Sequence, residues 1–227
     1  MTQPQARQSV TDQVREIVSA LEEQIVLGWL MPRERLLEDR LTGQFSCKKH
    51  VIREALTELE RMGLVERVLN KGAAVRFLSP EAVRQIYTVR EALETLAAEQ
   101  IPLPASPLLL KELKRIQMLH TGAVETNDHR GAFRANLAFH ECLFGACGNP
   151  YLVEIIRGAA QKVHGARFFT AASRDHLIQA RDEHWAIIQA LEEGNRVALV
   201  NLCKNHIGPS RDAYFAAVEA KTAREES

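Results

Sequence analysis

Residues 48–56 read Lys-Lys-His-Val-Ile-Arg-Glu-Ala-Leu, and this stretch decides how the N-terminal part of the chain is expected to fold. Basic residues crowd its start, and the apolar residues that follow recur at helical spacing. A helix of this kind can rest on a small domain while its first turns enter the major groove of DNA. An ordinary helix with a solvated basic turn would have the same pattern, so the flanking sequence must decide between them.

The flanking segments favour a winged helix-turn-helix. Before the basic helix, apolar residues recur every three or four positions over 11–26. After it, Asn70-Lys71-Gly72 separates two β-type runs, which is typical of a hairpin. Helices are expected over 11–26, 37–44 and from the basic turn to about 62, and strands over 64–68 and 73–77. The order of elements places Lys71 at the tip of the wing.

The residues expected to contact DNA are basic side chains near the reading helix, together with the residues of the wing turn. They are Arg35, Lys48, Lys49, His50, Arg53, Lys71 and Gly72.

Composition limits the class of protein. Lysine plus arginine and aspartate plus glutamate each number 29, so DNA binding must depend on local clustering of charge rather than on net charge. The 4 cysteines show no C-x-x-C pairing and are expected to be reduced thiols. With no signal peptide and no long apolar stretch, a cytoplasmic protein without a membrane partner is expected.

Leu78-Ser79-Pro80 marks a boundary, because serine caps a helix and proline fits its first turn. We therefore expect a DNA-binding domain over 1–78 and a second domain over 79–227. The second domain should be an all-α bundle, since strand signals are weak throughout it. Its helices are expected over 80–100, 107–124, 129–146, 149–172, 176–193 and 196–221.

Histidines in this second domain are spaced so that they can meet. His184 lies ten positions before Gly194 and His206 twelve after it, so in an antiparallel helix pair their heights differ by about 3 Å. The two imidazoles could share one metal ion, and a third from the helix carrying Asn136 and His140 would complete a set of three. Zinc, nickel, iron and manganese accept such ligands. Taken singly, each histidine is more commonly a surface or core residue.

Three segments of the N-terminal part resemble the GntR family of bacterial transcription regulators. They are Gly28–Leu36, similar to "G-x-L-x-P-G-x-x-L", Lys49–Leu56, similar to "S-R-x-P-V-R-E-A-L", and Leu59–Val65, similar to "L-x-x-x-G-L-V". Several positions depart from these patterns: they are Arg33, Asp39, Lys49 and Val51. The operator is therefore expected to differ from the common family consensus.

The second domain resembles the FCD effector domain of the FadR-type branch of that family. The matching segments are Tyr87–Glu94, Asn136–His140, Gly148–Leu152 and Glu183–Leu191. The resemblance implies one divalent metal per chain, held by His140, His184 and His206, with Asn136 in the position of an aspartate ligand. Asn136 is a neutral and weaker ligand, which alternatively hydrogen-bonds the effector. The resemblance also implies that Arg90 pairs with an effector carboxylate; a surface salt bridge with Glu94 is the alternative.

These features predict a homodimeric, ligand-responsive regulator, expected to be a repressor, that binds a palindromic operator and a small organic acid. Two alternatives remain. The metal itself can be the signal, or the histidines can form the centre of a metallohydrolase. The second alternative lacks an obvious general base, because Glu183 points about 100° away from His184 on a helix.

Overall fold

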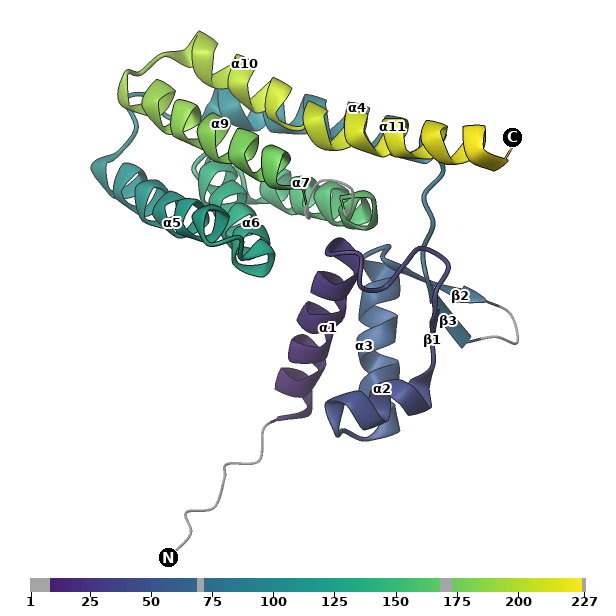
Figure 1. The fold of residues 1–227 in the computed structure, drawn as a ribbon. Coiled ribbons are helices and arrows are strands. Elements are labelled where there is room, and N and C mark those ends of the chain that lie inside the picture. The colour runs from purple at the N-terminus through teal and green to yellow at the C-terminus, as the bar shows by residue number, and fades with distance from the viewer. Residues whose placement is uncertain (1–8, 69–71, 168–172, 226–227) are drawn as a thin grey trace, which may run out of the picture. The chain divides into compact units, whose positions relative to one another are not determined.

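The computed structural model describes residues 9–68, 72–167 and 173–225 (Figure 1). The chain divides into two compact units, Met1–Phe77 and Leu78–Ser227. Each unit has its own hydrophobic core and is described by itself.

The first unit is a helical domain with a small sheet. Its elements are α1 (Val10–Val26), β1 (Arg35–Leu36), α2 (Glu38–Phe45), α3 (Lys49–Arg61), β2 (Val65–Val68) and β3 (Gly72–Val75). Ser9 caps α1, since its hydroxyl accepts a hydrogen bond from the Asp12 backbone N–H at 3.1 Å. Gly63 follows the end of α3 with a φ of 80°, a left-handed conformation that glycine adopts without a Cβ clash.

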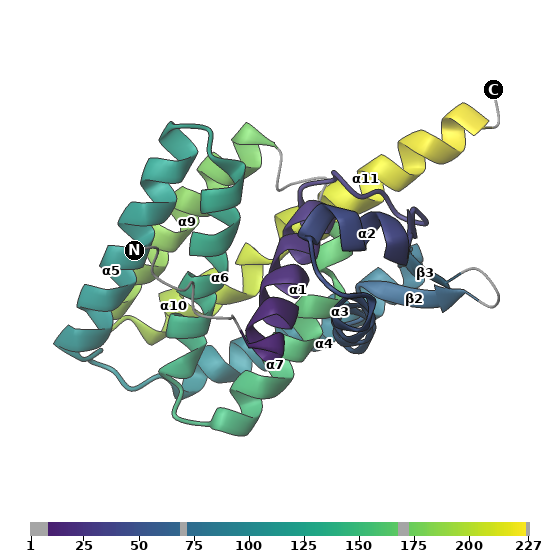
Figure 2. The same cartoon turned by 90° about the horizontal axis from the view of Figure 1, so that it is seen from below.

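The three strands form an antiparallel sheet in the order β1-β3-β2. Figure 2 shows β2 beside α3, as the contacts between these two elements require. The sequence predicted the β2–β3 hairpin, although β3 ends at Val75 rather than at 77. It did not predict β1, whose two residues are too few to show an alternating pattern.

The apolar face of α3 carries the core of the first unit. Ile52, Leu56 and Leu59 are each at most 1% exposed, and α3 packs against α1. The basic residues at the start of α3 are exposed. This division between the two faces confirms the predicted winged helix-turn-helix.

The second unit is an all-α bundle among the described residues. Its elements are α4 (Pro80–Gln100), α5 (Pro107–Glu125), α6 (His129–Gly145), α7 (Pro150–Lys162), the 3-10 turn η1 (His164–Ala166), α9 (Arg174–Glu192), α10 (Arg196–His206) and α11 (Gly208–Glu225). Serine or asparagine caps and first-turn prolines begin several of them, which explains why most of the predicted starts were close. α5 lies alongside both α6 and α9, and α9 pairs with α10 (Figure 1).

Two predicted helices of this unit were too long. The helix expected over 149–172 ends at Lys162 and is followed by η1, while 168–172 lie outside the described residues. The helix expected over 196–221 is divided at Ile207 into α10 and α11. Pro209 explains this break, because it has no N–H to donate to the Asn205 carbonyl and its ring crowds that carbonyl.

Membrane crossing demands a long apolar helix, and within the described residues none of the helices meets that requirement.

Replacing Leu59 by alanine is expected to destabilise the first unit by about 2–5 kcal/mol, because this fully buried side chain leaves a cavity between α1 and α3. Chemical denaturation measures the change. The matched control is Leu37→Ala, at a leucine that is 55% exposed, which should change the free energy of unfolding by less than about 0.5 kcal/mol. Equal effects of the two substitutions would contradict this assignment of the core.

Candidate functional site

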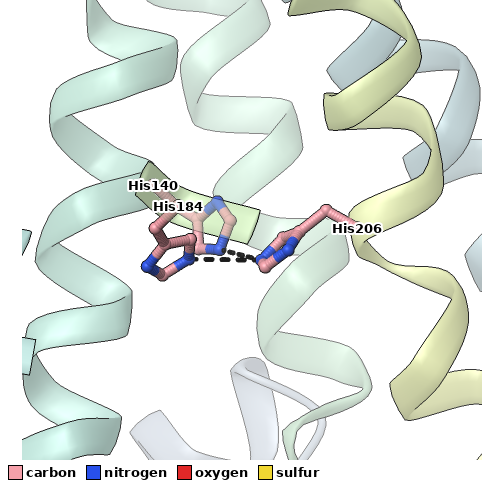
Figure 3. A group of neighbouring side chains, drawn as sticks. All are labelled: His140, His184 and His206. Atoms are coloured by element: carbon pink, nitrogen blue, oxygen red, sulfur yellow. Dashed lines mark hydrogen bonds between the residues drawn. The ribbon is translucent and has the colours of Figure 1, made fainter. Parts of the chain in front are cut away.

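Three helices of the second unit each bring one histidine to a common point. His140 comes from α6, His184 from α9 and His206 from α10, and their rings point toward one another (Figure 3). The Nε2 atom of His206 lies 3.1 Å from that of His140 and 3.3 Å from that of His184. The resemblance and the helix-pair spacing therefore predicted residues that do meet in space.

The outer nitrogens of two of these rings have polar partners. The Nδ1 atom of His184 lies 2.9 Å from Oε1 of Gln117, whose Nε2 donates to the Arg181 carbonyl at 2.9 Å. Because the amide N–H of Gln117 is used there, its oxygen accepts from His184, so the His184 proton is on Nδ1. Likewise, Nδ1 of His206 lies 2.5 Å from a carboxylate oxygen of Glu183, which can only accept while it is ionised.

This arrangement turns lone pairs toward one another. With protons on the outer nitrogens, the Nε2 atoms of His184 and His206 both present lone pairs at a separation of 3.3 Å. One proton can bridge only one pair of nitrogens, whereas a metal ion accepts all three lone pairs. Two nitrogens bound at 2.0–2.1 Å to a tetrahedral ion lie about 3.3 Å apart, so the spacing fits a transition metal. Gln117 and Glu183 occupy the positions of the outer partners that orient histidine ligands.

Burial disfavours the charged form of two of the three rings. His184 is fully buried, and burial followed by the charge of His206 lowers the pKa of both His140 and His184 well below the ordinary value. Neutral imidazoles are the form that binds metal. The His184 ring also stacks on Phe139, with the ring centres 4.0 Å apart, which restricts its rotation.

The sequence did not identify three neighbours of the triad. The expectation that Glu183 lies away from the histidines holds for His184 but is wrong for His206, because α10 packs against the side of α9 from which Glu183 projects. Gln117 comes from α5, and nothing in its sequence neighbourhood signals this role. His120, one turn further along α5, also lacks a sequence signal for such a role, yet its ring centre lies 5.1 Å from that of His184.

Arg90 forms the ion pair with Glu94 that was considered, but the pair is buried rather than at the surface. The two side chains are 5% and 2% exposed and 2.8 Å apart. Burial opposes the charge of Arg90, but Glu94 and Tyr87 together outweigh it and raise the pKa of the guanidinium. Arg90 and Arg167 both lower the pKa of His140, so positive charge lies close to the triad. Asn136 is half-buried on α6, one turn before His140.

The residues expected to contact DNA lie in the first unit. Those that the structure describes are exposed. Lys48, Lys49, His50 and Arg53 are exposed at the start of α3, Arg35 is exposed in β1, and Gly72 is exposed at the start of β3 with a φ of 81°. Lys71 lies outside the described residues. Two of these cations are already paired: Arg53 with Glu38, and Lys49 with Asp39.

A winged helix-turn-helix joined in one chain to a helical bundle with a buried histidine cluster is the organisation of a ligand-sensing transcription regulator. The comparisons agree, since residues 13–75 match the bacterial regulatory proteins of the gntR family and residues 85–208 match the FCD domain. The chain belongs to the GntR family of transcription regulators and carries its FCD domain. It is a DNA-binding regulator and not an enzyme.

Individual relatives are distant. The chain is 26% identical to the uncharacterized HTH-type transcriptional regulator YdhC of Bacillus subtilis, over 85% of this chain and 84% of that one. It is 24% identical to the gluconate operon transcriptional repressor of the same bacterium, over 78% and 74%. The fold is similar to that of E. coli McbR/YncC, with a TM-score of 0.75 and 18% identity over 92% of this chain and 98% of that one.

The histidine cluster should make the metal-free protein sensitive to acid. Burial, then the charges of His206 and Arg181, lower the pKa of His120 to about 4, from 6.5 in the unfolded chain. Between these pH values the unfolded chain binds a proton that the folded chain excludes, so stability is retained above pH 6.5 and lost as the pH falls toward 4. His120 alone contributes up to about 3 kcal/mol to this loss.

Denaturation of the dialysed His120→Leu variant from pH 8 to 4 tests this expectation. The difference from wild type at pH 8 gives the packing effect of the substitution. As the pH falls, the free energy of unfolding of the variant should then decrease less than that of wild type. Parallel curves for the two proteins over the whole range would show that His120 is not excluded from protonation in the folded state.

Proposed function

We propose that this regulator is a homodimeric repressor whose affinity for a palindromic operator is controlled by a small organic acid bound at a metal held by His140, His184 and His206. The observation that carries the proposal is the convergence of three Nε2 atoms, two of them 3.1 and 3.3 Å from the third. The names of relatives support repression. They include the gluconate operon transcriptional repressor and a probable D-xylose utilization operon transcriptional repressor.

One divalent ion per chain fits the donor set. Three neutral imidazoles suit zinc, nickel, iron or manganese. Asn136 stays the predicted fourth group, as a weak ligand or as a hydrogen-bonding partner of the effector. When bound, the metal supplies a positive charge and open coordination positions that a carboxylate can fill. The protein residues supply the orientation of the rings and a largely buried setting.

A carboxylate effector fits the surroundings of the triad. Arg90 and Arg167 bring positive charge close to His140. Tyr87 is buried beside Arg90, whose guanidinium carbon lies 5.1 Å from the centre of the Tyr87 ring. Arg90 is held by Glu94, which leaves its guanidinium oriented even before a ligand binds. A small acid that reaches the metal would therefore meet favourable charge.

Effector binding would act on DNA through the relative populations of dimers with different spacing of the reading helices. A ligand shifts such an equilibrium only by its difference in affinity for the two states. The organic acid is thus expected to bind more tightly to the form that does not fit the operator. If metal alone changes operator affinity and no acid adds to the change, the metal is the signal.

Elemental analysis of the untagged, extensively dialysed protein should find about one equivalent of a transition metal per chain. His184→Ala should lose it, because the variant removes one of three ligands and leaves Gln117 without its partner. His50→Ala, which removes an exposed histidine of the first unit, is the control and should retain the metal. A metal-free wild type that stays folded would make the triad a structural group.

Arg53→Ala should remove specific operator binding and leave the fold intact, because Arg53 is exposed on α3 and reads bases or phosphates from there. The loss is expected to be about 1–3 kcal/mol or more, measured on a duplex selected from random sequences. Arg61→Ala is the matched control, at an arginine 72% exposed near the other end of α3. Unchanged affinity of Arg53→Ala for the selected duplex would refute the role of α3.

A further inference from the structure

The cations at the start of α3 face acids at the start of α2. Lys49 Nζ lies 2.9 Å from an Asp39 oxygen and 3.8 Å from a Glu38 oxygen. Arg53 Nε lies 2.9 Å from the same Glu38 oxygen. The surface that is expected to read DNA is therefore not a simple basic patch, because two of its cations are already satisfied by carboxylates.

The two acids differ in exposure and in the contacts that they make. The Glu38 side chain is 24% exposed and touches both cations, so it fixes the direction of Arg53. The Asp39 side chain is 89% exposed and, within the part of the chain that the structure describes, forms its ion pair with Lys49 only. Glu38 thus holds two side chains of the reading helix α3 in place, whereas the Asp39 carboxylate is exposed to an approaching duplex.

The position of Asp39 matters for DNA. In a helix-turn-helix the first helix crosses the sugar-phosphate backbone, and a helix N-terminus normally attracts phosphate. Asp39 lies in the first turn of α2, where the helix dipole stabilises its charge in the free protein. An approaching phosphate would be repelled by this carboxylate and would compete with it for Lys49.

A carboxylate in this position has one kind of favourable partner on a duplex, which is an exocyclic amino group of a base. In the major groove, the exocyclic amino groups of cytosine and adenine donate hydrogen bonds, and a carboxylate can accept them. Phosphates, and the N7 and O6 atoms of guanine, offer only acceptors and would leave Asp39 unpaired. The cost of burying an unpaired charge then discriminates among sequences.

We propose that Asp39 is a specificity-determining residue, which weakens binding to DNA in general and selects half-sites that offer an exocyclic amino group, of cytosine or adenine, to its carboxylate. Glu38 acts as a positioning residue for Arg53. The inference rests on the proposed reading role of α3. A purely local role as a first-turn acid would change the stability of α2 but not the choice of sequence.

The test compares wild type with Asp39→Asn, which keeps the size of the side chain and removes its charge. Glu58→Gln is the matched control, since it also removes one carboxylate paired with a cation on α3, 2.6 Å from Arg61 near the other end of that helix. For each protein, half-sites are selected from a random duplex library, and affinity for one fixed, unselected duplex is measured at several salt concentrations. Thermal denaturation checks that each variant is folded.

Asp39→Asn should bind the unselected duplex roughly five- to tenfold more tightly than wild type, with a salt slope steeper by about one phosphate contact, because Lys49 is released. In its selected half-site, guanine and thymine should also be accepted at the position where wild type requires cytosine or adenine, because the asparagine amide donates hydrogen bonds as well as accepting them. Glu58→Gln should match wild type in both measurements. Both changes are required; if either is absent, or if Glu58→Gln shows the same changes, the proposal is overturned.

Failure of this proposal is distinguishable from failure of the reading role of α3. If Arg53→Ala loses specific binding while Asp39→Asn selects the same half-sites as wild type, α3 reads DNA and only the role of Asp39 is wrong. If Arg53→Ala binds the selected duplex as wild type does, the reading role itself is wrong.

Discussion

Three imidazole nitrogens that face one another from three helices are the constraint on which the account of the second unit depends. Two of the rings have their outer nitrogen tied to Gln117 or Glu183, so lone pairs converge where no protein donor can satisfy them all. Burial prevents the usual remedy of protonation for His140 and His184. The metal ion that we propose at this point would remove the repulsion and link α6, α9 and α10, so that a ligand bound to it could act on the bundle.

The sequence predicted the architecture where local patterns specify it. Helix caps, the apolar stripe of α3 and the hairpin turn all leave a clear local signal, and the spacing of His184 and His206 about Gly194 indicated that they meet. The helix carrying Asn136 and His140 was expected to supply the third imidazole, and the family resemblance then implied that His140 is a ligand. What the sequence could not supply depends on contacts between distant segments. Gln117 reaches His184 across 67 positions, and Glu183 reaches a histidine on the next helix rather than on its own.

Short elements and breaks were missed for a different reason. β1 has two residues and exists because β3 offers it a partner, so no pattern within it announces a strand. The break at Ile207 follows from Pro209, because proline interrupts the hydrogen bonding of a helix. The pairing of Lys49 with Asp39 likewise needed the packing of α2 against α3 before it was visible. A chain with no net charge can thus hold a reading surface that includes acids, and we propose that these acids help to decide which duplex is accepted.

X-ray absorption spectroscopy at the edge of the bound metal tests the central claim most directly, because it reports the ligands rather than the mere presence of an ion. The account predicts about three imidazole nitrogens at roughly 2.0–2.1 Å for zinc, and one fewer in His206→Ala reloaded with the same metal. A spectrum with sulfur ligands, or with fewer than two imidazoles in the wild-type protein, would contradict a metal centre at His140, His184 and His206.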